Sequence, residues 1–272
     1  MAKKKRQDLK DKLALITGGA RNIGLAIAKE LAAQGASIVL VDICRDLKTI
    51  PYALAGPNDL ERAVQEISKM GVKALGLTCD IRKEVQVKAA FQQVIDRFGR
   101  LDILVNNAGV VSLYPITGLS EKAWDEVVDV CLKGTYLCCK YALHPMIKQR
   151  YGKIVNISSV AGLRGLGLGV HYCAAKHGII GLTKALAMEA ADHHINVNAL
   201  CPGTTESPML EGLASQIQHE GDPYEHFAQQ HLFQDRRIPP QDIAQAVSWL
   251  VSDKSRSITG SVITVDAGWS AR

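Results

Sequence analysis

The chain has 272 residues, of which 47% are hydrophobic and 22% charged, and its formal net charge is +5. This composition excludes a globally disordered protein and supplies enough core for one large α/β domain. Four of the excess charges come from Lys3, Lys4, Lys5 and Arg6. We therefore predict a basic, flexible tail over residues 1–10, a single domain over residues 11–272, and no binding of nucleic acid.

No apolar run approaches the ~20 residues that cross a bilayer, and the basic start lacks the apolar segment of a secretory signal. The seven cysteines form no C-x-x-C pair, and several lie in apolar runs such as LGLTCD and VNALCPG. This usage is typical of small core residues in a reducing cytosol. We predict a cytoplasmic protein with no membrane segment, no disulfide framework and no metal site.

Short β-branched runs alternate with longer amphipathic segments along the chain. Strands are predicted at 13–17, 37–42, 73–80, 101–107, 152–158, 195–201 and 261–266. Helices are predicted near 22–34, 58–70, 82–98, 120–149, 171–191 and 240–252. Near-continuous apolar strands separated by helices are typical of a parallel sheet covered on both faces. The predicted fold is a single-domain, Rossmann-type, doubly wound α/β sheet.

The first predicted strand runs into TGGARNIG, residues 17–24. In an open parallel sheet, the first strand-to-helix turn usually holds phosphates. Gly18 and Gly19 permit a tight turn, and Gly24 lets the helix pack close to the sheet and present its N-terminal amides to a pyrophosphate. The position of the turn between a strand and a helix predicts a dinucleotide site.

The second predicted strand ends at Asp42, about twenty residues beyond this turn, where an acid can accept hydrogen bonds from an adenosine ribose. A carboxylate there would repel a 2′-phosphate, which favours NAD over NADP. Arg21 argues weakly for NADP, because a basic residue in the turn can meet a phosphate. The alternative interpretation of Asp42 is a turn residue at a strand end.

Tyr172 and Lys176 are four residues apart in a predicted helix, so they share one face. One interpretation is a surface tyrosine beside a solvated lysine. The other is a proton-transfer residue whose pKa is lowered by a fixed positive charge.

The motifs TGGARNIG, NNAG (106–109), NISS (156–159), YCAAK (172–176) and CPG (201–203) occur in this order. Together they resemble the short-chain dehydrogenase/reductase family over roughly residues 10 to 270. The resemblance implies that Tyr172 is the catalytic acid/base and that Lys176 lowers its pKa and holds the nicotinamide ribose. It also implies that Ser159 hydrogen-bonds the substrate oxygen.

The same resemblance implies a set of cofactor-binding residues around the sheet. Asp80 and Ile81 would flank the adenine, Asn107 would border the ribose, and the segment from Pro202 would lie against the nicotinamide. The full set is Gly18, Arg21, Asn22, Ile23, Gly24, Asp42, Asp80, Ile81, Asn107, Tyr172, Lys176, Pro202, Gly203 and Thr205.

Two positions depart from the family pattern. The middle glycine of the phosphate turn is Asn22, which tolerates positive φ better than most residues, so we expect the turn to survive. Cys131 stands where family members usually have an asparagine that helps to hold a water linked to the lysine. Because the main chain supplies part of that role, we still expect a working enzyme.

Residues 43–57 form an insertion of some ten residues relative to most family members. With AGLRG and HYCAAKHGIIGL, it is similar to the carveol-dehydrogenase-like branch. That branch implies a cyclic terpenoid secondary alcohol, tightly held NAD beneath the insertion, and electron transfer to the peptide-derived carrier mycofactocin. The alternative is a surface embellishment, which loops tolerate at low cost.

The segment from about 204 to 239 is predicted to be a substrate lid. Its apolar side chains, with Val111, Leu163, Leu166 and Leu168, predict a pocket for a hydrophobic alcohol or ketone; plain packing of lid helices is the alternative. No cluster of basic residues converges there, which argues against acidic substrates. The lid residues concerned are Met209, Leu210, Leu213, Ile217, Tyr224, Phe227, Leu232 and Phe233.

The resulting prediction is an NAD-dependent oxidoreductase for a cyclic or terpenoid secondary alcohol and its ketone. The family resemblance implies a homotetramer. The alternative is a catalytically weak, nucleotide-binding regulatory protein, for which Cys131 is the main support. A serine hydrolase is excluded because the chain has no G-x-S-x-G motif.

Overall fold

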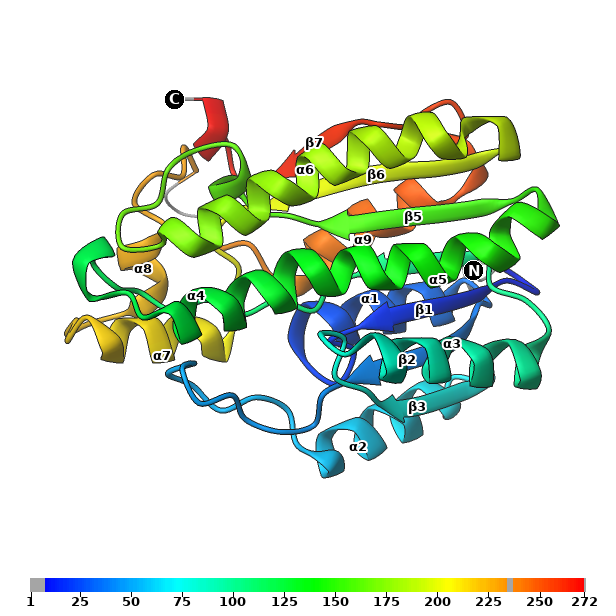
Figure 1. Ribbon diagram of the computed structural model, residues 1–272, viewed down its shortest axis with the longest axis horizontal. Helices are drawn as coiled ribbons and strands as arrows, with labels where there is room; N and C mark the ends of the chain where they lie inside the picture. Colours follow the sequence, from blue (N-terminus) through cyan, green and yellow to red (C-terminus); the bar gives the residue numbers. More distant parts are fainter. Residues whose placement is uncertain (1–7, 234–236, 272) are drawn as a thin grey trace, which may run out of the picture.

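The structure is a computed structural model that describes residues 8–233 and 237–271. Within them, seven parallel strands form one sheet in the order β3-β2-β1-β4-β5-β6-β7 (Figure 1). The strands are β1 Leu13–Thr17, β2 Ser37–Asp42, β3 Ala74–Thr78, β4 Ile103–Asn106, β5 Gly152–Ile157, β6 Ile195–Pro202 and β7 Val262–Val265. The predicted doubly wound parallel sheet is confirmed.

The helices follow the predicted segments, with one interruption. They are α1 Asn22–Ala33, α2 Pro57–Ser68, α3 Glu84–Phe98, α4 Glu121–Val128, α5 Gly134–Gln149, α6 Val170–Ala190, α7 Pro208–Gln216, α8 Pro223–Phe227 and α9 Pro240–Val251. The single helix predicted over 120–149 is divided into α4 and α5 by a π-helical turn, Asp129–Lys133. Such turns are frequent at functional sites.

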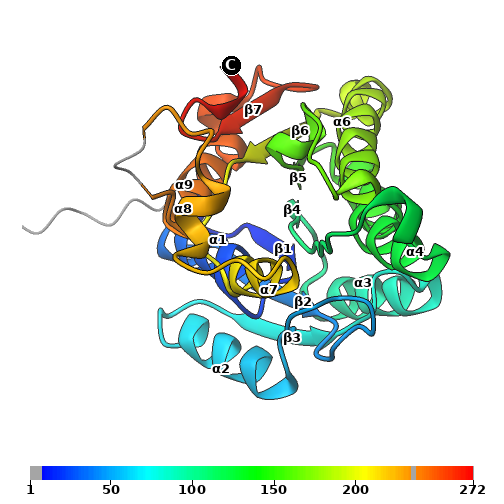
Figure 2. The same cartoon turned by 90° about the vertical axis from the view of Figure 1, so that its left-hand side faces the viewer.

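The two faces of the sheet carry separate cores. Successive side chains of a strand point to opposite sides, so Leu13 and Leu15 join the core under α3, α5 and α6. Ala14 and Ile16 join the core under α1, α2 and α9. Figure 2 shows the sheet between these two layers of helices. Because both faces are buried, the strands are continuous apolar runs rather than alternating ones.

The predicted N-terminal tail lies mostly outside the described residues. Of its last three residues, Leu9 is buried and donates its backbone N–H to the Gln34 carbonyl at 3.1 Å. The packed body therefore includes a residue before position 11. Within the part of the chain that the structure describes, no helix is long and apolar enough to cross a membrane.

The sheet changes its direction of winding between β1 and β4. The chain runs from β1 outward to β2 and β3, and then returns to place β4 on the other side of β1. Loops that leave the carboxyl ends of these two neighbours diverge, and they open a crevice where ligands bind in such sheets. The strand order by itself therefore predicts a functional site at the carboxyl ends of β1 and β4.

Gly24 provides a test of this packing. A Cβ there would overlap the Gly18 carbonyl oxygen, which is backbone and cannot move aside. We expect Gly24→Ala to lower the free energy of unfolding by about 2–3 kcal/mol, measured by urea denaturation. Gly165→Ala is the control, because its Cβ would meet open space; it should be neutral or slightly stabilising. Equal losses in both variants would contradict the close packing.

Candidate functional site

The phosphate turn adopts the geometry that its residues predict. Gly18 has φ of 62° and Asn22 has φ of 48°, so the asparagine takes the left-handed conformation that a glycine usually supplies. The turn then leads directly into α1, which begins at Asn22. The expectation that Asn22 preserves the turn is confirmed.

Asn107 holds this turn from the end of β4. Its side-chain amide donates to the carbonyls of Thr17 at 3.0 Å and Gly18 at 3.1 Å. Its backbone N–H and that of Ala108 donate to the Thr17 hydroxyl at 3.0 and 3.1 Å. Asn107 therefore fixes the shape of the turn, as well as lining the cavity beside it.

Asp42 is buried at the end of β2 with its carboxylate held in place. The carboxylate accepts hydrogen bonds from the backbone N–H groups of Ala20 at 3.2 Å and Cys44 at 3.3 Å. Burial raises the pKa of Asp42, and these hydrogen bonds oppose that rise. The acid thus links the phosphate turn to the start of the insertion.

Ser159, Tyr172 and Lys176 lie in the wall of the same cavity, which has a volume of about 320 Å³. Ser159 follows β5 and accepts a hydrogen bond from the Ala161 N–H at 3.1 Å. The Lys176 Nζ donates to the Ile157 carbonyl at 2.9 Å and lies 5.4 Å from the centre of the Tyr172 ring. The structure brings together the three residues that the sequence separates.

The predicted cofactor-binding residues also meet in this cavity. All of them line it: Gly18, Arg21, Asn22, Ile23, Gly24, Asp42, Asp80, Ile81, Asn107, Tyr172, Lys176, Pro202, Gly203 and Thr205. They arrive from the carboxyl ends of several strands, as a doubly wound sheet requires. Among the described residues, no group of three or more His, Cys, Asp or Glu side chains is arranged to hold a metal ion.

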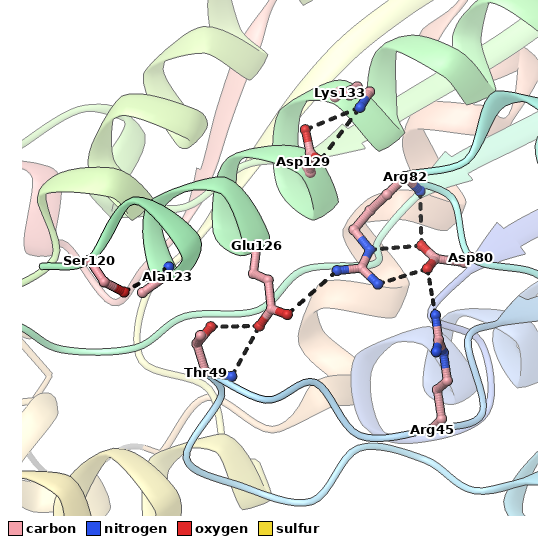
Figure 3. A network of polar contacts seen from close by, with 9 residues as sticks. All are labelled: Arg45, Thr49, Asp80, Arg82, Ser120, Ala123, Glu126, Asp129 and Lys133. Carbon is pink, nitrogen blue, oxygen red and sulfur yellow. Dashed lines mark hydrogen bonds and ion pairs between the residues drawn. The ribbon is translucent and has the colours of Figure 1, made fainter.

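The insertion, residues 43–57, is anchored by a polar network (Figure 3). Arg45 pairs with Asp80 at 2.9 Å, and Arg82 pairs with the same carboxylate at 2.7 Å. Thr49 donates to Glu126 of α4 through its N–H at 3.0 Å and its hydroxyl at 2.6 Å. Burial by itself raises the pKa of Asp80, but the hydrogen bonds and charge of its arginines outweigh it and lower the pKa to about 2.

Apolar and backbone contacts hold the rest of the insertion down. Leu47 and Ile50 are buried against residues of α4, the π-helical turn and α6. Arg21 of the phosphate turn donates to the Ala53 carbonyl at 2.7 Å. The Tyr52 hydroxyl accepts the Val111 N–H at 3.0 Å. The insertion is therefore a packed wall of the cavity, and the alternative of a surface embellishment is wrong.

The predicted lid contains α7 and α8 and is joined to the body by the side-chain amide of Gln216. This amide accepts from the Leu113 N–H at 2.8 Å and donates to the Leu113 carbonyl at 2.6 Å. Within the lid, the Tyr224 hydroxyl accepts the Ile238 N–H at 2.7 Å. Gly212 of α7 approaches Tyr52 so closely that a Cβ would overlap its side chain. Lid and insertion thus pack directly against each other.

Only part of the predicted apolar lining faces the cavity. Val111, Leu166, Met209, Leu210, Leu213 and Phe227 line it. Leu163, Leu168, Ile217, Tyr224, Leu232 and Phe233 do not; Leu232 and Phe233 are about half exposed. Sequence reasoning missed Tyr52, Arg164 and Trp269 as lining residues. The sequence could have indicated Arg164, because it lies in the loop between Ser159 and Tyr172. No sequence feature indicates Trp269 as a lining residue.

The family model described as Enoyl-(Acyl carrier protein) reductase matches residues 18–270. The chain belongs to the short-chain dehydrogenase/reductase family. It is 36% identical over 260 residues to the 3-oxoacyl-(acyl-carrier-protein) reductase FabG of Staphylococcus aureus, covering 94% of this chain and 97% of that protein.

Solved members of the family share the whole fold. The carveol dehydrogenase of Mycobacterium avium, crystallised with NAD, superposes with a TM-score of 0.92 at 30% identity, covering 97% of this chain and 99% of that one. A levodione reductase superposes with a TM-score of 0.88 at 33% identity, with the same coverage of both chains. The resemblance to the carveol-dehydrogenase-like branch is confirmed.

Cys131, the departure from the family pattern, lies within the π-helical turn. Its thiol donates to the Val110 carbonyl at 3.4 Å, and its own carbonyl accepts the Thr135 hydroxyl at 2.7 Å. Its sulfur and the Lys176 ammonium both lie beside Gly109. The Cys131 thiol thus lies near the lysine while it bonds to the Val110 carbonyl.

The pKa of Tyr172 is raised in the structure, and the lowering effect of Lys176 stays a prediction. Burial raises the pKa of Tyr172 well above its ordinary range, against an opposing hydrogen bond from Ser159. Burial lowers the pKa of Lys176. The loss of solvent around the phenol is thus the main influence on the pKa of Tyr172.

Tyr52 tests the packed insertion. Tyr52→Phe removes the partner of the Val111 N–H and should lower the free energy of unfolding by about 1 kcal/mol. Tyr52→Ala also removes the ring between the insertion and α7, and should cost about 3 kcal/mol. Urea denaturation of both variants separates the contribution of the hydrogen bond to the free energy of unfolding from that of the packed ring. A loss below about 1 kcal/mol for Tyr52→Ala would show that the insertion is not packed in solution.

Proposed function

We propose that the protein is an NAD-dependent oxidoreductase that interconverts a hydrophobic secondary alcohol, cyclic or terpenoid, and its ketone. The convergence of Ser159, Tyr172 and Lys176 on one cavity with the glycine-rich turn carries this proposal. The names of the carveol dehydrogenase and the levodione reductase support a substrate of this kind. The apolar lining from Val111, Leu213 and Phe227 suits a hydrophobic skeleton.

The residues of the turn and of β2 fit NAD. The buried Asp42 carboxylate, fixed by two backbone N–H groups, can accept hydrogen bonds from ribose hydroxyls and would repel a 2′-phosphate. Arg21, which argued for NADP, already donates to the Ala53 carbonyl. The complex of carveol dehydrogenase with NAD supports the same cofactor.

When bound, NAD supplies the hydride chemistry, and the chain supplies orientation and the proton. The Tyr172 hydroxyl donates its proton to the ketone oxygen in reduction and takes the alcohol proton in oxidation. The Ser159 hydroxyl fixes that oxygen. Lys176, held by the Ile157 carbonyl, keeps a positive charge beside the phenol and favours its ionised form over what burial alone would allow.

The insertion and the surface helices suggest how the protein works with partners. The anchored insertion supports a proposal that NAD is held tightly and that electrons pass to a carrier such as mycofactocin.

Exposed apolar side chains on α5, α6 and α9, namely Tyr136, Met188 and Trp249, support a homotetramer. The seven free cysteines support a cytoplasmic location.

A catalytically weak nucleotide-binding protein is the second candidate. Cys131 favours it, because a thiol bonded to the Val110 carbonyl is a poor substitute for an asparagine that holds water. The arrangement of Ser159, Tyr172 and Lys176 favours the enzyme instead.

The decisive test is turnover of a panel of cyclic secondary alcohols, followed by absorbance of reduced nicotinamide with NAD and then NADP. We expect turnover with NAD at least about tenfold faster than with NADP, because of Asp42. A parallel sample contains an artificial dye acceptor without added nucleotide. Turnover with the dye, together with NAD recovered from denatured protein, would establish trapped cofactor. The absence of turnover in every sample would favour the catalytically weak nucleotide-binding protein.

The raised pKa of Tyr172 predicts different pH dependences for the two directions. Ketone reduction uses the neutral phenol and should stay constant from about pH 6 to 9, whereas alcohol oxidation uses the phenolate and should rise with pH. Tyr172→Phe should lower kcat by about 10²–10⁴-fold in both directions. Steady-state pH profiles of both proteins measure this. An oxidation rate independent of pH in the wild type would assign the proton transfer to another group.

A further inference from the structure

Five charged side chains line the cavity, and four of them are already engaged. Asp42 and Asp80 accept the hydrogen bonds described above, and Arg21 and Lys176 donate to the backbone carbonyls of Ala53 and Ile157. The fifth is Arg164. Among residues 8–233 and 237–271, no hydrogen bond or ion pair is formed by its guanidinium.

Arg164 lines the cavity from the loop between β5 and α6, five residues beyond Ser159. Its side chain is half-buried. The lining of the same cavity includes apolar side chains such as Leu166 and Met209, which carry no charge to pair with the guanidinium.

The backbone around Arg164 is fixed, so its position is a property of the fold. Its N–H donates to the Val160 carbonyl at 3.0 Å. The Leu166 N–H donates to the Cys173 sulfur of α6 at 3.1 Å, and the Leu168 carbonyl accepts the Tyr114 N–H at 2.8 Å. This loop is thus joined both to α6 and to the segment after β4.

A guanidinium that is partly removed from water and unpaired is complemented best by a carboxylate, which its planar fork binds through two parallel hydrogen bonds. We propose that Arg164 binds a carboxylate of the substrate. The substrate is then a hydrophobic hydroxy acid or oxo acid whose carboxylate is remote from the reacting carbon. This inference rests on the proposed function and names its substrate class. One arginine suffices where the walls are apolar, so the lack of a basic cluster does not exclude an acid.

A binding experiment tests Arg164 without requiring turnover. Ligand-observed NMR on the NAD-loaded protein measures the Kd of cyclohexanecarboxylate and of cyclohexanecarboxamide, its neutral counterpart. We expect the carboxylate to bind about 10–100-fold more tightly, the difference to vanish in Arg164→Gln, and part of it to remain in Arg164→Lys. Arg256→Gln is the control, because Arg256 is exposed near the start of β6 and does not line the cavity; it should keep the full difference.

Turnover provides the second readout. With 4-hydroxycyclohexanecarboxylate, Arg164→Gln should raise KM about 10–100-fold and leave kcat within about threefold, while the corresponding amide is unaffected. If wild-type protein binds acid and amide equally, or if Arg164→Gln weakens both alike, Arg164 is a solvated residue at the rim and the proposal is overturned. If carboxylate binding depends on Arg164 but no alcohol is oxidised, the proposed function fails while the carboxylate site stands. If neutral alcohols are oxidised but carboxylate binding does not depend on Arg164, the proposed function stands and the carboxylate site is overturned.

Discussion

The side chain of Asn107 joins the two strands on which the site depends. By donating to the Thr17 and Gly18 carbonyls, it fixes the turn after β1 from the end of β4, at the point where the sheet reverses its winding. The hydrogen bonds therefore define the shape of the turn, and with it the positions of the α1 amides.

The residues that follow Asn107 contact the other elements of the site one after another. Gly109 passes beside Lys176 and Cys131, where there is no room for a bulky side chain. Its successors then bond in turn to the three elements that close the cavity. The Val111 N–H donates to Tyr52 of the insertion, the Ser112 hydroxyl bonds to His171 of α6 at 3.0 Å, and Leu113 bonds to Gln216 of α7. These bonds therefore connect the insertion, α6 and the lid to the segment that follows Gly109.

Burial and charge act in opposite directions on the ionisable groups of this site, and which one prevails depends on the partners. Asp80 is buried but meets two arginines, so its carboxylate stays charged. Tyr172 is partly buried, and the loss of solvent around its phenol raises its pKa. The site therefore contains a carboxylate whose pKa is lowered by its arginine partners and a phenol whose pKa is raised by loss of solvent.

The sequence by itself determined the sheet, its two helix layers and the residues of the central machinery. Strands such as 13–17 and 37–42 were predicted to the residue, because buried parallel strands are continuous apolar runs bounded by turns. Asp42 was found from its spacing beyond the glycine-rich turn, whereas Ser159 and the role of Tyr172 were implied by the resemblance of the ordered motifs to the family. Only the tertiary structure decided the pKa of Tyr172, the packing of Tyr52 against α7, and the unpaired state of Arg164 among the described residues. Desolvation, close approach and the satisfaction of hydrogen bonds depend on groups distant in sequence, and no local pattern records them.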